Sequence, residues 1–210
     1  MEWSDSWHGA FRIELRAQAI GLASRGWPVL PGTYPTGSGW SDGVRPAAGL
    51  RPAHEDWADQ LGADGDQIAQ WWNGGPYNLL VATGAKLDAI EVGTDLGRRT
   101  AAVLRSSGLP VPIAATPEGR WLFLTNPGQD VSAELAAHED VIVHGAGSWV
   151  PLPPTAFPHG VAHWRVRPEV WSWTLPQSRL IQNAMVAALA GRRSFGAIVP
   201  GLVGVDRAVA

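Results

Sequence analysis

Helical and extended segments alternate along this chain, and glycine and proline mark many of the boundaries between them. Apolar residues that recur at three- and four-residue steps predict helices over residues 11–24, 68–72, 95–107 and 177–190. Short apolar runs predict strands over residues 27–30, 78–82, 87–92, 113–116, 121–125, 141–143 and 148–152. The Gly-, Pro- and Ser-rich stretch 31–52 predicts a loop. This order is typical of an α+β domain and not of a parallel series of βαβ units.

The ends of these elements carry local signals. Gly26 is expected to end the first helix, and Asp64 or Asp66 to cap the second. Thr94 is expected to cap the third helix. The turn 83–86 suits a hairpin between the strands 78–82 and 87–92. We expect a domain over residues 1–174, followed by a C-terminal helix and an apolar tail over 175–210.

Composition excludes several classes of protein. With 45% hydrophobic and 17% charged residues, the chain can bury a sizeable core. The formal net charge of -3 argues against a strongly basic surface that grips nucleic acid by neutralising phosphates. The absence of cysteine excludes disulfides, thiolate zinc sites and cysteine nucleophiles. No apolar run has the length of a membrane span and the N-terminus lacks a signal-peptide pattern, so we expect a cytoplasmic protein without membrane partners.

Several segments, in order, carry a resemblance to a known family. Residues 78–84 read Asn-Leu-Leu-Val-Ala-Thr-Gly, where the family has Asn-Ile-Gly-Ile-Ala-Thr-Gly. Residues 144–150 read His-Gly-Ala-Gly-Ser-Trp-Val, where the family has Arg-Gly-x-Gly-Gly-Tyr-Val, and a Pro-Pro-Thr follows at 153–155. Together with 25–31, 68–72 and 87–92, these segments resemble the N-terminal domain of bifunctional DNA primase/polymerases, the Prim-Pol family, over residues 17–164. The resemblance implies one mixed sheet that contains the strands starting near Asn78, Leu87, Trp121 and Val141, with helices packed on it.

The resemblance also implies template-directed nucleotidyl transfer with two divalent cations, Mg²⁺ or Mn²⁺, held by carboxylates. The family's Asp-x-Asp pair falls on Glu91 and Gly93, and its phosphate-contacting histidine falls on Trp121. The family's third aspartate falls on Ile142, which we expect to be a buried apolar strand residue. Because most metal-binding and catalytic positions are replaced, efficient catalysis is not expected.

The remaining candidates each have two interpretations. Glu91 is either a residual catalytic and metal-binding carboxylate or a strand-end acid that faces solvent. Asp95 is either a second metal ligand or a first-turn acid stabilised by the helix dipole, and Asp140 could also substitute for a lost carboxylate. Arg120 and His144 are candidate nucleotide contacts. The alternatives are a solvated turn arginine at 120 and a hydrogen-bonded structural histidine at 144.

Two classes of function follow from these residues. The first is a catalytically impaired or inactive pseudoenzyme that binds a nucleotide, single-stranded nucleic acid or a protein. The second is an active DNA primase/polymerase, a nucleotidyltransferase with an altered two-metal site. No cofactor is certain from the sequence, and Mg²⁺ or Mn²⁺ is expected if the protein is active. We expect any helicase partner in DNA replication to be a separate protein, since 210 residues leave no room for a second large domain.

Overall fold

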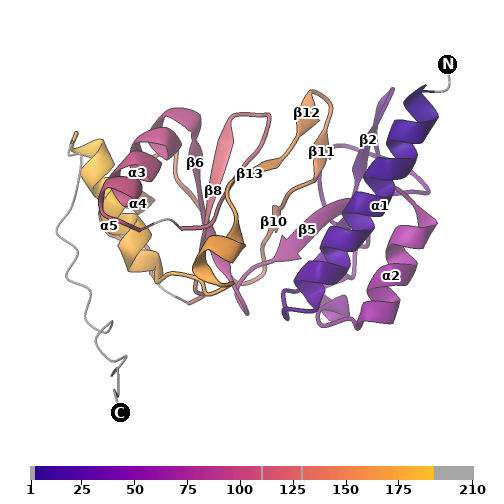
Figure 1. Cartoon of the computed structure of the whole chain (residues 1–210), viewed down its shortest axis with the longest axis horizontal. Coiled ribbons are helices and arrows are strands. Elements are labelled where there is room, and N and C mark those ends of the chain that lie inside the picture. Colours follow the sequence, from indigo (N-terminus) through magenta and orange to yellow (C-terminus); the bar gives the residue numbers. More distant parts are fainter. Residues whose placement is uncertain (1–2, 110, 129, 192–210) are drawn as a thin grey trace, which may run out of the picture.

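The computed structural model describes residues 3–109, 111–128 and 130–191, and its elements form successive layers (Figure 1). Helices α1 and α2 stand at one end, α3, α4 and α5 at the other, and the main sheets lie between them. The helices are α1 (Trp3–Ala23), α2 (Gly65–Gly74), α3 (Thr94–Ser106), α4 (Ala133–Ala136) and α5 (Ser178–Leu189), with short 3₁₀ helices η1 (Trp57–Gln60) and η2 (Pro168–Trp171). The predicted α+β class and C-terminal helix are confirmed.

The central layer is an antiparallel sheet with the strand order β13-β7-β8-β6-β9. Its strands are β6 (Asp88–Gly93), β7 (Ile113–Ala115), β8 (Arg120–Thr125), β9 (Ile142–His144) and β13 (His163–Val166). Along the β6–β8 pair, Gly93 lies opposite Arg120, and on the other side of β6 Glu91 lies opposite Ile142. Because paired residues of neighbouring strands point to the same face, these four positions share one face of the sheet.

A second, smaller sheet has the order β1-β5-β10, formed by β1 (Val29–Gly32), β5 (Asn78–Ala82) and β10 (Trp149–Pro151). The prediction that the strand at Asn78 joins the same sheet as β6, β8 and β9 is therefore wrong. So is the predicted hairpin between β5 and β6, because β1 and β10 occupy the two edges of β5. Gly84, at φ +101, carries the chain from one sheet to the other and packs against the backbone of Ala146, where a side chain would not fit. All strand pairs in the described residues are antiparallel.

Composition predicted a loop over residues 31–52, but this stretch also contains strands. It contains the small sheet β2 (Tyr34–Thr36), β3 (Gly39–Ser41) and β4 (Pro46–Ala47). A separate ribbon pairs β11 (Ala156–Phe157) with β12 (Gly160–Val161). Strands of two or three residues are too short to leave an alternating pattern in the sequence, so composition alone could not reveal them.

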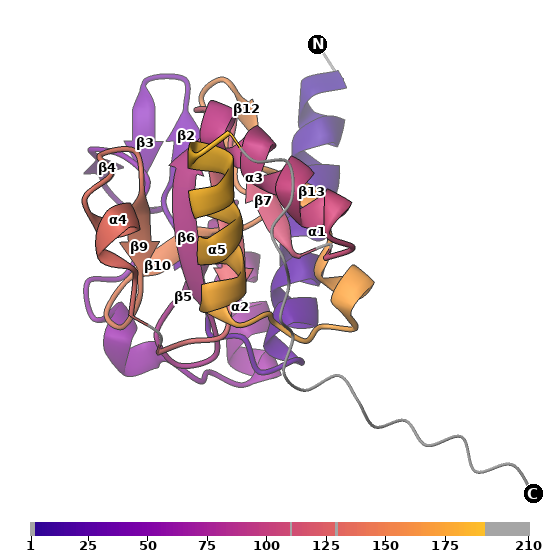
Figure 2. The ribbon, with the colours of Figure 1, turned by 90° about the vertical axis from the view of Figure 1, so that its left-hand side faces the viewer.

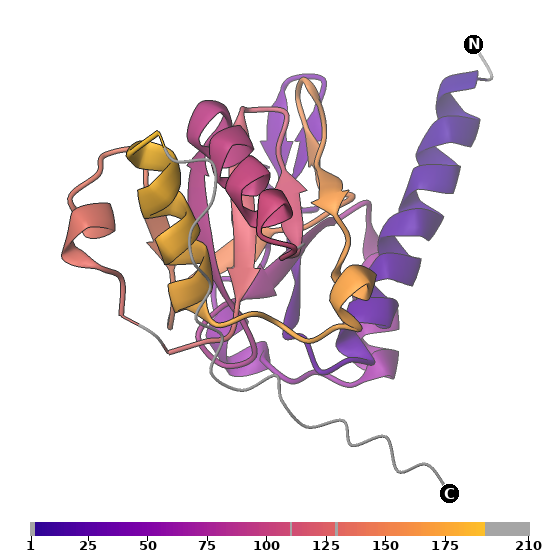
Figure 3. The same ribbon diagram turned by 60° about the vertical axis from the view of Figure 1, so that its left-hand side comes forward.

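Two apolar cores lie on the two faces of the central sheet. Residues of α1, α2 and the β1-β5-β10 sheet pack on one face, against Ala89 and Leu122. Helices α3 and α5 pack side by side on the other face, against Ile90 and Val92 (Figures 2 and 3). Helix α5 is thus part of the second core, while residues 192–210 of the predicted tail lie outside the described residues.

The predicted helix ends are partly confirmed. Asp64 caps α2, and its carboxylate accepts a hydrogen bond from the backbone N–H of Gln67 at 2.8 Å. Thr94 does not cap α3, because it is the first helical residue and its hydroxyl donates to the carbonyl of Gly119. Within the described residues, no helix has the length and apolar character to cross a membrane.

Candidate functional site

Four polar side chains form a hydrogen-bonded cluster on the central sheet, and we name them the Arg120 cluster: Glu91, Arg120, Asp140 and His144. They lie on the face that is turned away from α3 and α5. The alternation along β6 places them there, since Ala89 packs in the first core and Ile90 in the second. The fold thus brings together four of the candidates named from the sequence: Glu91, Arg120, His144 and Asp140.

The guanidinium of Arg120 lies between two carboxylates. Its Nε donates to Glu91 Oε1 at 2.7 Å, and its Nη1 donates to Asp140 Oδ1 at 2.6 Å. Its Nη2 also donates to the backbone carbonyl of Asp140 at 3.2 Å. The side chains of Glu91 and Arg120 are only 16% and 26% exposed. The interpretations of Glu91 as a solvent-facing acid and of Arg120 as a solvated turn arginine are therefore wrong.

His144 holds the second oxygen of the Glu91 carboxylate. Its Nε2 lies 2.8 Å from Glu91 Oε2, and because a carboxylate can only accept, Nε2 carries the proton of this bond. The other ring nitrogen, Nδ1, lies 3.1 Å from the hydroxyl of Ser148. Sequence reasoning missed Ser148, although its position after the Gly-Ala-Gly turn places it close to His144. Both oxygens of Glu91 thus have a partner within the protein.

Asp140 occupies the space that a side chain at position 93 would need. The backbone N–H of Gly93 donates to Asp140 Oδ2 at 3.0 Å. A Cβ atom on Gly93 would lie 2.7 and 2.8 Å from the two carboxylate oxygens of Asp140. The second carboxylate of the cluster therefore comes from the segment before β9 and replaces a side chain on β6.

The cluster favours the charged form of both partners in its central ion pair. Burial raises the pKa of Glu91, but the hydrogen bonds and charges of His144 and Arg120 outweigh this effect, and the net pKa is lowered. Burial acts to lower the pKa of Arg120, whereas the hydrogen bonds and charges of Glu91 and Asp140 raise it overall. The ion pair is therefore ionised at neutral pH.

The other predicted positions lie elsewhere. Asp95 is 81% exposed and pairs with Arg99, one helical turn away, at 3.2 Å. Trp121 points to the opposite face of the sheet, where its ring covers Gly97 of α3, so Arg120 and not residue 121 faces Glu91. Ile142 shares the face of Glu91 but is 45% exposed, and the expectation that it is buried is wrong because β9 is an edge strand.

The cluster does not fit a centre for two divalent cations. Such a centre needs several free carboxylate oxygens at one point. Here the guanidinium already binds both carboxylates, and in the described part of the chain no group of three or more histidine, aspartate or glutamate residues is arranged to hold a metal ion.

The lowered pKa of Glu91 predicts how the cluster responds to acid. Ionised Glu91 stabilises the fold fully above its ordinary pKa of 4.5, and this contribution is lost as pH falls through the lower pKa of the folded state. We expect Glu91→Gln to be less stable than the unchanged protein at neutral pH, with a difference that shrinks below 4.5. Urea unfolding of both proteins across this range measures it. A difference that stays constant or grows in acid would contradict the direction of the shift.

The fold and the cluster describe an α+β domain with a polar site on its central antiparallel sheet. The chain belongs to the Prim-Pol family, because the family model described as bifunctional DNA primase/polymerase, N-terminal, matches residues 19–178. The match covers all four residues of the Arg120 cluster. No curated protein matched the chain in a search.

Proposed function

We propose that this Prim-Pol domain does not polymerise nucleotides, and that it binds a nucleotide or single-stranded nucleic acid in the cytoplasm, beside a separate replication protein. The observation that carries the proposal is the position of the Arg120 guanidinium, which bridges Glu91 and Asp140. The positive charge of the guanidinium neutralises both carboxylates, as a metal cation between them would. It supplies no open coordination position for a triphosphate.

Displacing the guanidinium is energetically unfavourable. A hydrogen bond to a charged group contributes about 1.5–3 kcal/mol, and Arg120 makes several of them inside the cluster. A Mg²⁺ ion would have to break these bonds, shed part of its own water shell and leave Arg120 without its partners. A role in binding, without chemistry at Glu91, agrees better with these energies.

An active polymerase is the second candidate, and one observation favours it. Asp140 brings a second carboxylate to the backbone of Gly93, so two acids do meet on one face of the sheet. If Arg120 moved away when a triphosphate bound, these acids could approach a cation.

A primer-extension assay with Mn²⁺ and labelled nucleotides separates the two candidates. We expect no template-dependent product from the unchanged protein or from Glu91→Gln, and no saturable rise in melting temperature with Mn²⁺. A cation that binds only the folded state at a hundredfold excess over Kd would add about 2.7 kcal/mol of stability, which a thermal shift readily detects.

Product that depends on the template and disappears in Glu91→Gln would overturn the proposal and support an active enzyme. Absence of both product and binding to single-stranded DNA or nucleotide would overturn the binding role.

A further inference from the structure

A cavity of about 460 Å³ lies on the same face of the central sheet as the Arg120 cluster but at the opposite edge, next to the edge strand β13. Its walls come from α1, from the Pro153–Pro154 segment after β10 and from residues 161–167 of β12, β13 and their flanks. Its volume lies within the range of about 300–1,000 Å³ typical of sites for small ligands. No residue of the Arg120 cluster lines it.

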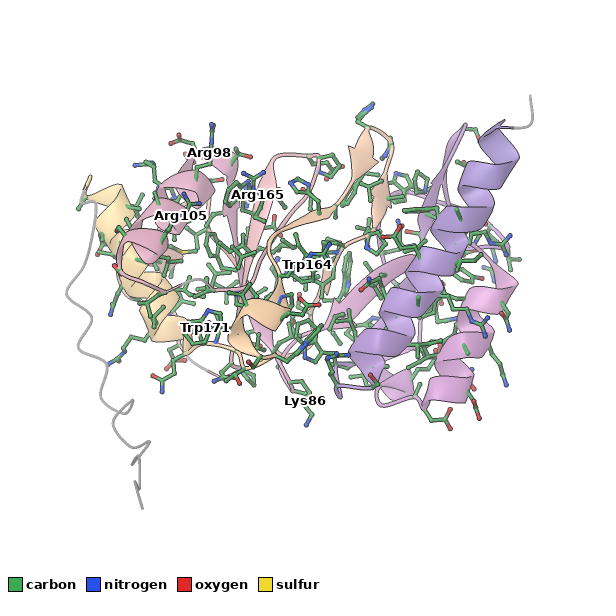
Figure 4. All side chains as sticks on the ribbon, in the orientation of Figure 1. Lys86, Arg98, Arg105, Trp164, Arg165 and Trp171 are labelled. Carbon is green, nitrogen blue, oxygen red and sulfur yellow. The ribbon has the colours of Figure 1, made fainter. Side chains whose placement is uncertain are left out.

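Apolar rings, two aromatic and two of proline, form much of the cavity wall. Phe11 on α1 and Trp164 on β13 are half-buried. Pro153 and Pro154 are buried and also line the cavity. Figure 4 places Trp164 on the side of β13 towards α1, and Arg165 on the side towards α3. The aromatic rings of Phe11 and Trp164 can stack on planar heterocycles, and base stacking on an aromatic side chain contributes about 1–3 kcal/mol per base.

Polar groups of opposite charge stand on the two walls. Glu14 and Gln18 lie one turn apart on α1, so they share a face of the helix. His163 and Arg167 line the β13 side. Among the residues that the structure describes, none of these four side chains has a hydrogen-bond or ion-pair partner, which leaves their polar atoms available to a ligand.

We infer that this cavity binds a nucleotide, with the base stacked against Trp164 and the prolines, and the phosphate held by Arg167 and His163. The inference rests on the proposed binding function and assigns it a place away from the Arg120 cluster. Glu14 and Gln18 recognise the edge of the base by hydrogen bonds. Guanine presents an N–H and an amino group side by side, a donor pair that the carboxylate of Glu14 accepts, so a guanine nucleotide fits best.

Isothermal titration calorimetry of the full chain with guanosine monophosphate tests the site. We expect saturable binding that weakens about 10-fold or more in Arg167→Ala, because a charged hydrogen bond contributes about 1.5–3 kcal/mol. Arg165→Ala is the matched control. It removes the same charge from the same segment, but its guanidinium lies over Trp121, 5.0 Å from the ring centre, on the other face of the sheet, so binding should not change.

A labelled single-stranded DNA oligonucleotide in the same variants separates the two sources of this ligand. Binding of the strand but not of the mononucleotide, lost in Arg167→Ala, assigns the cavity to one unit of a strand and supports the site. Equal losses in Arg165→Ala and Arg167→Ala, or binding that disappears in Glu91→Gln and persists in Arg167→Ala, would overturn it. The latter result would move the ligand to the Arg120 cluster and leave the proposed function intact, whereas no binding of either probe would remove both.

Discussion

Replacing Gly93 with aspartate is expected to lower the free energy of unfolding by about 2–4 kcal/mol, although it restores the acid that the family carries at this position. The backbone of Gly93 has φ -66, which any residue adopts, so the effect comes from contacts. The new Cβ would meet both carboxylate oxygens of Asp140, and the new carboxylate would repel them. Urea or thermal unfolding measures the loss.

Matched variants separate size from charge. Gly93→Ala adds only the Cβ and should lower stability by about 1–3 kcal/mol. Gly37→Asp adds the same side chain where no atom lies within 4 Å of a Cβ, and it should have little effect. The double change Gly93→Asp with Asp140→Gly moves the carboxylate from the segment before β9 to β6 and should recover part of the loss. A Gly93→Asp protein as stable as the unchanged one would mean that Asp140 is not held in this space.

Replacing Arg120 with alanine is the second change with a large expected effect, a loss of about 2–4 kcal/mol at neutral pH. Removing the guanidinium leaves two carboxylates without their positive partner, and Glu91 would keep only its bond to His144. The estimate stays below that for a fully buried pair, because Arg120 and Asp140 are 26% and 36% exposed and water screens their attraction.

Arg98→Ala is the control for this change. Arg98 lies exposed on α3 and, within the described residues, its side chain has no partner, so its loss should change stability by less than about 0.5 kcal/mol. The loss in Arg120→Ala should also shrink in acid, where Glu91 becomes protonated. Similar stabilities for the Arg98 and Arg120 variants would show that the ion-pair network contributes little.

Periodicity located most helices and strands of this fold but not how the strands pair. The helix over 95–107 and the strand over 87–92 have long, clear patterns, and the structure confirms both within one or two residues. Pairing depends on contacts between distant residues. The run at Asn78–Ala82 is buried throughout, which suits a strand paired on both sides, yet its partners lie about 50 residues before it and 70 after it.

The sequence predicted only part of the candidate site, because the site also depends on contacts between distant residues. Comparing positions with the family pointed to Glu91 and His144 and showed which acids were replaced. It could not show that Asp140 reaches back to Gly93, because this contact joins residues 47 positions apart. It also could not show which face residue 121 occupies. That depends on the register between β6 and β8, and a shift of one residue reverses every side chain.

The strand order β1-β5-β10 also determines when β5 can be paired on both edges during synthesis. The central strand β5 gains its second neighbour only after the chain has been made through Pro151. Until then the buried run Leu79, Leu80, Val81 and Ala82 has one unpaired edge, and such an edge invites pairing with other chains. A nascent chain that stalls before β10 therefore exposes this edge to other chains, and the second core closes only after α5 has been made as well.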